Sequence, residues 1–259
     1  MFPSLRVVCL LFALLLVSGD VNSKPAATSP AVLSNPPVIV IGFVGGFVHH
    51  DDRVHTEVQL VERLREEYAS GIFVQTFENH RGKDAHKAVL QRLDANRDGI
   101  LSPEEKQNAR IIIFGHSWGA SETVELARAL QKDGIPVLLT IQVDSVSKRG
   151  EDDAVIPANV VQAINFYQLD GMLHGLPQIR AADPARTRIL GNFRSDYKSK
   201  PLTCGSYPWW DRVFMKPHIQ IECDPAVWKQ VETLIRSNLS LEAQLPSPTE
   251  TNSPASPLH

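Results

Sequence analysis

The chain has 259 residues, of which 43% are apolar and 21% are charged, a composition typical of a globular protein. Its formal net charge of −3 at pH 7 argues against nucleic acid or an anionic membrane surface as a partner. The length allows one large α/β domain or two small ones.

The N-terminus carries the pattern of an export signal. Arg6 precedes the apolar run Val7–Val17, and several small residues follow that run. This pattern predicts a secretory signal peptide over residues 1–23. Residues 24–36, rich in Pro, Ala and Ser, are then a flexible leader. The apolar run is short for a membrane span, so we expect a secreted or periplasmic protein with no membrane span.

Apolar, β-branched runs alternate with amphipathic patterns along the rest of the chain. Strands are predicted at Val38–Ile41, Ile72–Phe77, Ile111–Phe114 and Val137–Val143, with two further candidates at Val160–Tyr167 and Arg188–Leu190. Helices are predicted at Glu57–Tyr68, Ala85–Leu93, Ala120–Leu130 and Trp228–Ile235. This alternation predicts an α/β fold, a mostly parallel sheet with helices on both faces, as a single domain over residues 37–238. Residues 239–259 are expected to be a disordered tail.

The most informative motif is Gly115-His116-Ser117-Trp118-Gly119, which matches G-x-S-x-G. It follows a predicted buried strand and opens a predicted helix, which is the context that a nucleophile elbow requires. A Cβ at Gly115 or Gly119 would collide with the neighbouring strand or helix. We therefore interpret Ser117 as a catalytic nucleophile, the alternative being a plain glycine turn.

On this motif the chain resembles the α/β-hydrolase superfamily, and within it the secreted esterase and lipase-like members, over Pro37 to Ser237. The resemblance implies a nucleophile, an acid and a histidine in that order along the chain. The implied base is His218, just ahead of the predicted closing helix, with His174 and His116 as alternatives.

Two residues are candidates for the acid of the triad. Asp144 ends the strand that follows the nucleophile unit, whereas most family members place the acid one strand later, which here points to Asp170. We prefer Asp144 because a well-defined apolar strand delivers it, while the glycine after Asp170 is flexible. In either case the carboxylate would orient the imidazole and stabilise its protonated form.

The resemblance also implies two backbone N–H groups that bind the oxyanion. One is that of Trp118, and the other is that of Phe43 or Val44 in the loop after the first strand. Ile41 stands where family members often have a histidine, so the chain departs from the family there. Four aromatic residues either form an apolar wall for an acyl chain or pack a long loop: Tyr207, Trp209, Trp210 and Phe214.

Removal of the signal peptide leaves two cysteines, Cys204 and Cys223, in the mature chain. Two cysteines in an exported protein most simply form one disulfide, the alternative being two free buried thiols. The bridge would restrain the loop that presents His218.

Residues 94–105 match the EF-hand calcium loop at every specified position. Gly99 supplies the sharp turn, and Leu101 is the apolar residue that packs beneath such a loop. The predicted oxygen ligands are Asp94, Asn96, Asp98, the carbonyl of Ile100, Ser102 and Glu105. We expect one structural Ca²⁺ ion there, the alternative being an acidic turn that caps a helix.

The run His49-His50-Asp51-Asp52 resembles a metal cluster. Adjacent residues cannot easily converge on one ion, however. We interpret this run as a polar loop near the mouth of the site.

These features together predict a secreted serine hydrolase that cleaves small-molecule carboxylic esters through Ser117, His218 and Asp144. A thioesterase or an amidase of the same fold is the alternative within the enzymes. A catalytically inactive, calcium-dependent binding protein is the alternative outside them.

Overall fold

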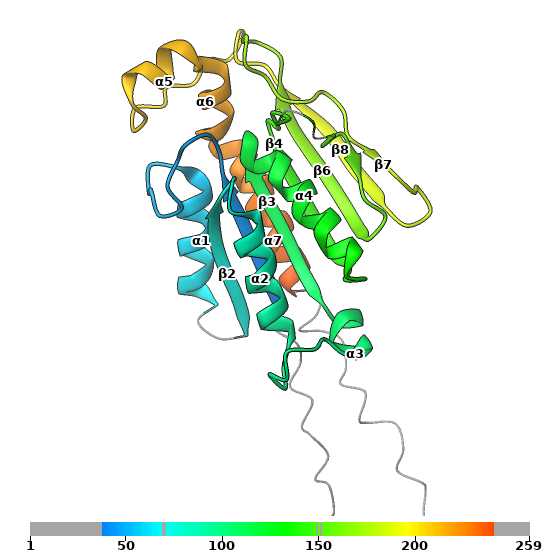
Figure 1. Cartoon of the computed structure of the whole chain (residues 1–259). Helices are drawn as coiled ribbons and strands as arrows, with labels where there is room; N and C mark the ends of the chain where they lie inside the picture. Colours follow the sequence, from blue (N-terminus) through cyan, green and yellow to red (C-terminus); the bar gives the residue numbers. More distant parts are fainter. Residues whose placement is uncertain (1–37, 69–70, 149, 151, 241–259) are drawn as a thin grey trace, which may run out of the picture. The chain divides into compact units, whose positions relative to one another are not determined.

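Six parallel strands form the central sheet of the computed structural model, which describes residues 38–68, 71–148, 150 and 152–240 (Figure 1). They run in the order β2-β1-β3-β4-β6-β8. Their bounds are β1 (Val38–Val44), β2 (Ile72–Glu78), β3 (Arg110–His116), β4 (Val137–Val143), β6 (Val160–Gln168) and β8 (Arg188–Ser195). A separate pair, β5 (Val155–Ile156) and β7 (Arg180–Ala181), forms a small second sheet.

Helices cover both faces of the large sheet. The helices of the described residues are α1 (Thr56–Glu67), α2 (Gly82–Leu93), α3 (Pro103–Gln107), α4 (Trp118–Lys132), α5 (Trp209–Phe214), α6 (Lys216–Glu222) and α7 (Pro225–Ser240). The apolar faces of α1 and α7 pack on one side of the sheet, and those of α2 and α4 pack on the other (Figure 1). The predicted fold class, a mostly parallel sheet between two layers of helices, is confirmed.

The apolar run of β3 shows why this strand is central. Side chains along a strand point alternately to the two faces. Ile111 and Ile113 accordingly pack in the cluster beneath α2 and α4, while Ile112 and Phe114 pack in the cluster beneath α1 and α7. An uninterrupted apolar run is therefore what a strand buried on both faces requires.

The strand order reverses between β1 and β3. From β1 the chain crosses to β2 on one side and then returns to β3 on the other. In open α/β sheets such a switch point leaves a crevice at the carboxyl ends of the strands. The segments that follow Val44 and His116 meet at this edge, which is where we place the candidate site.

The ten predicted elements are all present, but several of their boundaries differ from prediction, and the structure adds further elements. The closing helix α7 begins at Pro225 and extends to Ser240, beyond the predicted end of the domain. Helices α3, α5 and α6 and the short strands β5 and β7 were not predicted. The signal peptide (1–23), the leader (24–36) and the tail from residue 241 lie outside the described residues.

The described residues all belong to one compact unit. Among the helices of this part of the chain, none combines the length and the apolar character needed to cross a membrane.

Candidate active site

The backbone at Ser117 has the strained geometry that the G-x-S-x-G motif predicts. This residue lies between β3 and the first residue of α4, with φ 57° and ψ −126°. Positive φ is uncommon outside glycine, and such strain concentrates at functional positions. A Cβ at Gly115 would lie 2.5 Å from the backbone of Gly119, and a Cβ at Gly119 would lie 2.3 Å from the carbonyl oxygen of Phe43. Both positions therefore require glycine.

A continuous chain of hydrogen bonds joins Ser117, His218 and Asp144. Ser117 Oγ lies 2.8 Å from His218 Nε2, and His218 Nδ1 lies 2.7 Å from Asp144 Oδ2. All three residues are buried. The structure thus brings together three residues separated by up to 101 positions. In this arrangement Nδ1–H donates to the carboxylate, which leaves Nε2 free to accept the serine proton.

Several donors hold the Asp144 carboxylate in place. Besides the imidazole, it accepts hydrogen bonds from Gln168 N at 3.0 Å, Gln168 Nε2 at 2.8 Å and Gly175 N at 2.7 Å. The alternative acid, Asp170, instead accepts from the backbone amide of Tyr197 at 2.7 Å. The structure therefore places Asp144, and not Asp170, against His218.

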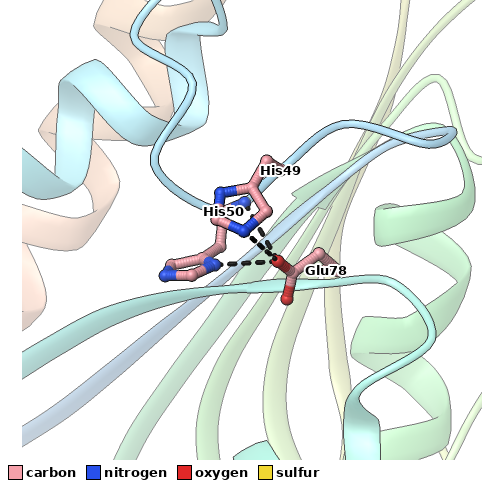
Figure 2. A group of neighbouring side chains, drawn as sticks. All are labelled: His49, His50 and Glu78. Carbon is pink, nitrogen blue, oxygen red and sulfur yellow. Dashed lines mark hydrogen bonds and ion pairs between the residues drawn. The ribbon is translucent and has the colours of Figure 1, made fainter.

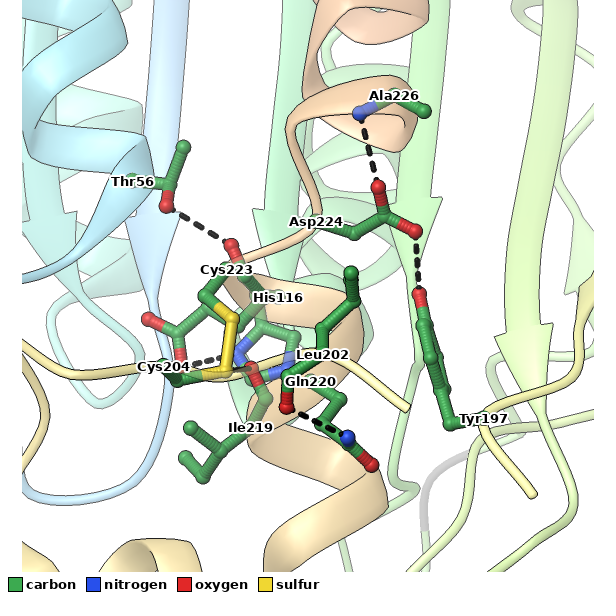
Figure 3. Close-up of a disulfide and its surroundings, with 11 residues drawn as sticks. Thr56, His116, Tyr197, Leu202, Cys204, Ile219, Gln220, Cys223, Asp224 and Ala226 are labelled. Carbon is green, nitrogen blue, oxygen red and sulfur yellow. Dashed lines mark hydrogen bonds and ion pairs between the residues drawn. A yellow bond between two sulfur atoms is a disulfide. The ribbon is translucent and has the colours of Figure 1, made fainter. Parts of the chain in front are cut away.

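His218 lies on a helix and not in the loop that the sequence analysis predicts. The proline beside it, Pro217, sits in the first turn of α6, where a proline is tolerated. Cys223 follows this helix and is bonded to Cys204, with their Cα atoms 5.9 Å apart (Figure 3). The disulfide predicted from the two cysteines is present, and it holds the end of the helix that presents the imidazole.

The two predicted oxyanion donors differ in their surroundings. Trp118 is the first residue of α4, so its N–H is one of the helix N-terminal donors without an intrahelical acceptor. Phe43 lies inside β1 and pairs with strands on both sides, so its amide belongs to the sheet. Gly45 comes directly after the strand, and a Cβ there would lie 2.9 Å from Ser117 Cβ. The segment after β1 thus borders the nucleophile, and it approaches Ser117 at Gly45 rather than at Phe43.

Exposed apolar side chains surround the carboxyl edge of the sheet. Phe47, in the segment after β1, is 97% exposed and its ring lies edge-on to that of Trp118, with 5.6 Å between ring centroids. On α5, Trp209, Trp210 and Phe214 are also exposed. These three residues are therefore not core packing for the loop, whereas the fourth predicted aromatic, Tyr207, is buried.

Sequence analysis missed most of a buried polar cluster that lies behind the imidazole. We name it the buried histidine–glutamate cluster; its members are His55, Glu57, His116 and Glu222. The rings of His116 and His218 are in contact, with centroids 4.5 Å apart. A signal for Glu57 was present, because its spacing from the apolar residues of α1 places it on the buried face of that helix.

Burial dominates the electrostatics of this cluster. It lowers the pKa of His116 to about 4, so this imidazole is neutral at pH 7. It raises the pKa of the Glu57 carboxyl well above its usual range, and the nearby charge of Glu222 adds to this effect. Burial opposes ionisation of Glu222 as well, but the imidazoles of His116 and His55 outweigh it and lower the pKa of that carboxyl.

The adjacent histidines after β1 lie in a polar loop, as the sequence analysis predicts, and both approach one carboxylate oxygen of a neighbouring strand. His50 Nδ1 lies 2.8 Å from Glu78 Oε1, and His49 Nε2 lies 3.6 Å from the same oxygen (Figure 2). Glu78 ends β2, so a neighbouring strand supplies the residue that joins them. Half or more of the His49 side chain is exposed, so this second group is open to solvent.

The predicted calcium loop connects α2 to α3. It has positive φ at Arg97 and Gly99, 60° and 82°, so the chain turns sharply there. The side chain of Asp94 accepts from the amides of Asp98 and Gly99, and Glu105 reaches back across the loop to the amide of Ala95 at 2.9 Å. Leu101 packs against the core beneath α2 and α4, as predicted. Carboxylate oxygens are the ligands that Ca²⁺ prefers, and those of Asp94, Asp98 and Glu105 are bonded to backbone amides of the loop in this structure.

No family model matches the chain, and no curated protein matches it in sequence. Among solved structures, it is similar to a thermostable esterase from Pseudomonas putida, with 11% identity, a TM-score of 0.41, and coverage of 84% of this chain and 78% of the esterase. It is also similar to the RedJ thioesterase of the prodiginine pathway in Streptomyces coelicolor, with 13% identity, a TM-score of 0.33, and coverage of 80% and 97%. Similarity at this level does not identify the reaction, so the reaction is inferred from the residues of the site.

Proposed function

We propose that this chain is a serine hydrolase that cleaves carboxylic esters, with Ser117 as the nucleophile, His218 as the proton carrier and Asp144 as the acid. The observation that supports this most strongly is the buried hydrogen-bond chain through these three residues, which ends at a serine with a strained backbone. Such a constellation is recognised by geometry and roles rather than by fold.

The first half of the reaction is acylation. His218 Nε2 takes the proton of Ser117 Oγ as that oxygen attacks the acyl carbon, and a tetrahedral intermediate forms. The protonated imidazole stays bonded to Asp144, whose negative charge stabilises it. The imidazolium then gives its proton to the leaving alcohol, and the acyl group remains on the serine.

Backbone amides at the switch point would stabilise the developing oxyanion. The N–H of Trp118 begins α4, where the helix dipole also favours negative charge. A second N–H would come from the segment after β1; Phe43 was the first candidate, and the approach of Gly45 to Ser117 supports a donor slightly further along. Water then attacks the acyl-enzyme, with His218 again accepting the proton.

We also propose that residues 94–105 bind a structural calcium ion and that the protein is exported. The ion would be held by Asp94, Asn96, Asp98, the carbonyl of Ile100, Ser102 and Glu105. Calcium supplies no step at the serine, because the loop precedes the amino end of β3 and Ser117 follows its carboxyl end, about 23 Å away along seven residues of strand. The Cys204–Cys223 bond supports an oxidising compartment.

The test is the hydrolysis of p-nitrophenyl acetate and butyrate by the full chain. We expect turnover by the wild type and a loss of about 10⁵-fold or more in Ser117→Ala. Ser199→Ala is the matched control, because this exposed serine bonds only locally to Asp196, and it should keep wild-type activity. Equal turnover by wild type and Ser117→Ala would contradict the proposal. Parallel assays with a thioester and an anilide distinguish an esterase from a thioesterase and from an amidase.

A further inference from the structure

The buried histidine–glutamate cluster draws its four members from three elements. His55 is the N-cap of α1 and Glu57 lies in the first turn of that helix. His116 ends β3, and Glu222 ends α6. Glu57 is 0% exposed, and His116 and Glu222 are each 2% exposed. Two carboxyl groups and the His116 imidazole are thus enclosed in the protein interior beside the ring of His218, while the His55 side chain is 12% exposed.

The donor atoms of these residues converge on one space. His55 Nδ1 lies 2.5 Å from Glu222 Oε1, and one donor atom each from His55, Glu57 and Glu222 fall within 4.8 Å of one another. His116 Nδ1 lies 3.3 Å from Glu222 Oε2 and 3.8 Å from Glu57 Oε1, so it borders the same space. The separations of 3.3 and 3.8 Å are close to those between ligands that share one small metal ion, whereas the 2.5 Å contact of His55 with Glu222 is a hydrogen bond that an ion would replace.

Glu57 shows that the hydrogen bonds within the cluster leave it incomplete. Neither of its carboxylate oxygens has a hydrogen-bond partner among the described residues, although the residue is fully buried. Its Oε1 lies 3.8 Å from His116 Nδ1, too far for a hydrogen bond, and a buried carboxylate without hydrogen bonds is costly. Here a second carboxylate lies next to it, so a proton on one group or a cation between them has to offset the repulsion.

We infer that His55, Glu57 and Glu222 bind a divalent metal ion of the zinc type, with His116 as the fourth ligand. Imidazole nitrogen with carboxylate oxygen is a donor set that suits Zn²⁺ in tetrahedral geometry. Two ionised carboxylates would match the ion's charge. His55 Nε2 lies 3.9 Å from Asp52 Oδ2, and such an outer carboxylate is the usual means of orienting a ligating imidazole.

The ion would position α6. His218 and Glu222 are four residues apart on this helix and so lie on the same face, one turn from each other. The backbone carbonyl of Glu222 already accepts from Thr56 Oγ1 at 2.8 Å, and the disulfide lies at the next residue (Figure 3). A metal ion bound by Glu222 together with residues of α1 and β3 would be a third link between α6 and the rest of the fold. The ion touches no reacting atom, so its ligands are structural and positioning residues.

The test is the zinc content of the full chain, purified without added metal chelators and then dialysed against excess Ca²⁺ and a trace of Zn²⁺. We expect about one zinc ion per chain in the wild type. We expect none in Glu57→Gln, which keeps the shape of the side chain but loses a charged ligand. Glu62→Gln is the matched control on the same helix, because that carboxylate faces outward to Arg53, and it should retain the zinc. Glu105→Gln, which alters the calcium loop, should retain it as well.

Replacement of zinc by Co²⁺ gives a readout that does not depend on the variant folding. A four-coordinate site of imidazole and carboxylate should give the wild type an intense visible absorption, whereas Co²⁺ bound at an exposed oxygen site gives a weak one. Absence of zinc from folded wild type, or equal zinc in wild type and Glu57→Gln, would overturn the inference and assign a shared proton to the two carboxyl groups. Neither readout requires ester hydrolysis, so the metal site and the proposed function can fail separately.

Discussion

Two polar clusters meet at the carboxyl edge of the sheet, and they differ in how completely their atoms are bonded. In the triad, hydrogen bonds run without a break from Ser117 to an acid that further amides and a glutamine side chain also hold. In the buried histidine–glutamate cluster, both oxygens of Glu57 and the Nε2 atom of His116 lack hydrogen-bond partners among the residues that the structure describes. The rings of His116 and His218 touch, so the two clusters are neighbours.

This difference separates a site that is ready for chemistry from one that needs a ligand. Groups aligned in advance avoid reorganisation during the reaction, and the triad is aligned by the protein alone. A buried group left without a partner needs a proton or an ion. The group of His49, His50 and Glu78 supports the distinction, because there the buried carboxylate is bonded to His50 and the two histidines are exposed.

The largest effect should come from breaking the triad at its acid. Asp144→Asn should lower turnover of p-nitrophenyl esters by about 10⁴-fold, because the amide no longer selects the productive tautomer of His218 or stabilises its charge. Asp170→Asn is the matched control. Its carboxylate binds the backbone near Tyr197, so we expect a much smaller kinetic loss. A larger loss in Asp170→Asn than in Asp144→Asn would reverse the assignment.

The disulfide tests both clusters at once, because α6 supplies a residue to each. Replacing Cys204 and Cys223 with serine opens a loop whose ends are 19 residues apart, and the free energy of unfolding should fall by about 3 kcal/mol. Chemical denaturation of the variant and of wild type with and without dithiothreitol measures this. Reduced wild type should match the variant. An unchanged midpoint on reduction would show that the bridge does not hold α6.

The calcium loop lies away from both clusters and should affect only stability. Free calcium at ~100 times the dissociation constant should raise the free energy of unfolding by about 3 kcal/mol. The melting temperature with calcium and with a calcium-specific chelator measures this shift. Glu105→Gln should remove most of it, because the loop loses its closing carboxylate. A chelator that abolishes hydrolysis while the melting temperature stays constant would contradict a purely structural ion.

The smallest effect should appear at Glu78, the carboxylate that His49 and His50 approach. Burial opposes its ionisation, but hydrogen bonds from His50 and from the backbone lower its pKa to about 2. A carboxyl with a depressed pKa stabilises the fold at pH values above its ordinary value, and that stabilisation is lost as the pH falls from about 4.5 towards 2. The free energy of unfolding of wild type should therefore exceed that of Glu78→Gln by about 1 kcal/mol at pH 6, and this difference should shrink by pH 3. A difference that grows on acidification would contradict this reading.

Local patterns were enough to predict the six strands of the large sheet, the strained turn at Ser117 and the carboxylate that lies against His218. Strand β3 is an uninterrupted apolar run, and Asp144 ends the next such run, so each carried its own signal. The helix under His218 escaped prediction because α6 is only seven residues long and has a proline in its first turn. Its stability comes from packing and from the bridge at Cys223, which periodicity does not report.

The buried histidine–glutamate cluster could not be predicted because its contacts link distant parts of the chain. His55 and Glu222 are 167 residues apart. Glutamate is rarely buried, so the position of Glu57 on the apolar face at the start of a helix is more readily interpreted as an exposed first turn than as a buried carboxyl. The three aromatic residues of α5 were visible in the sequence but could not be assigned a role from it, since they are exposed and their role depends on what binds there.

The measurement that tests the central claim most directly is the labelling of the full chain by a fluorophosphonate, followed by intact mass and peptide mapping. The account predicts one phosphonyl group per chain on Ser117 in wild type. It predicts no label in Ser117→Ala and very slow labelling in His218→Ala, because the serine then lacks its proton acceptor. Folded wild type that stays unlabelled, or that carries the label on another residue, would contradict the assignment of Ser117 as the nucleophile.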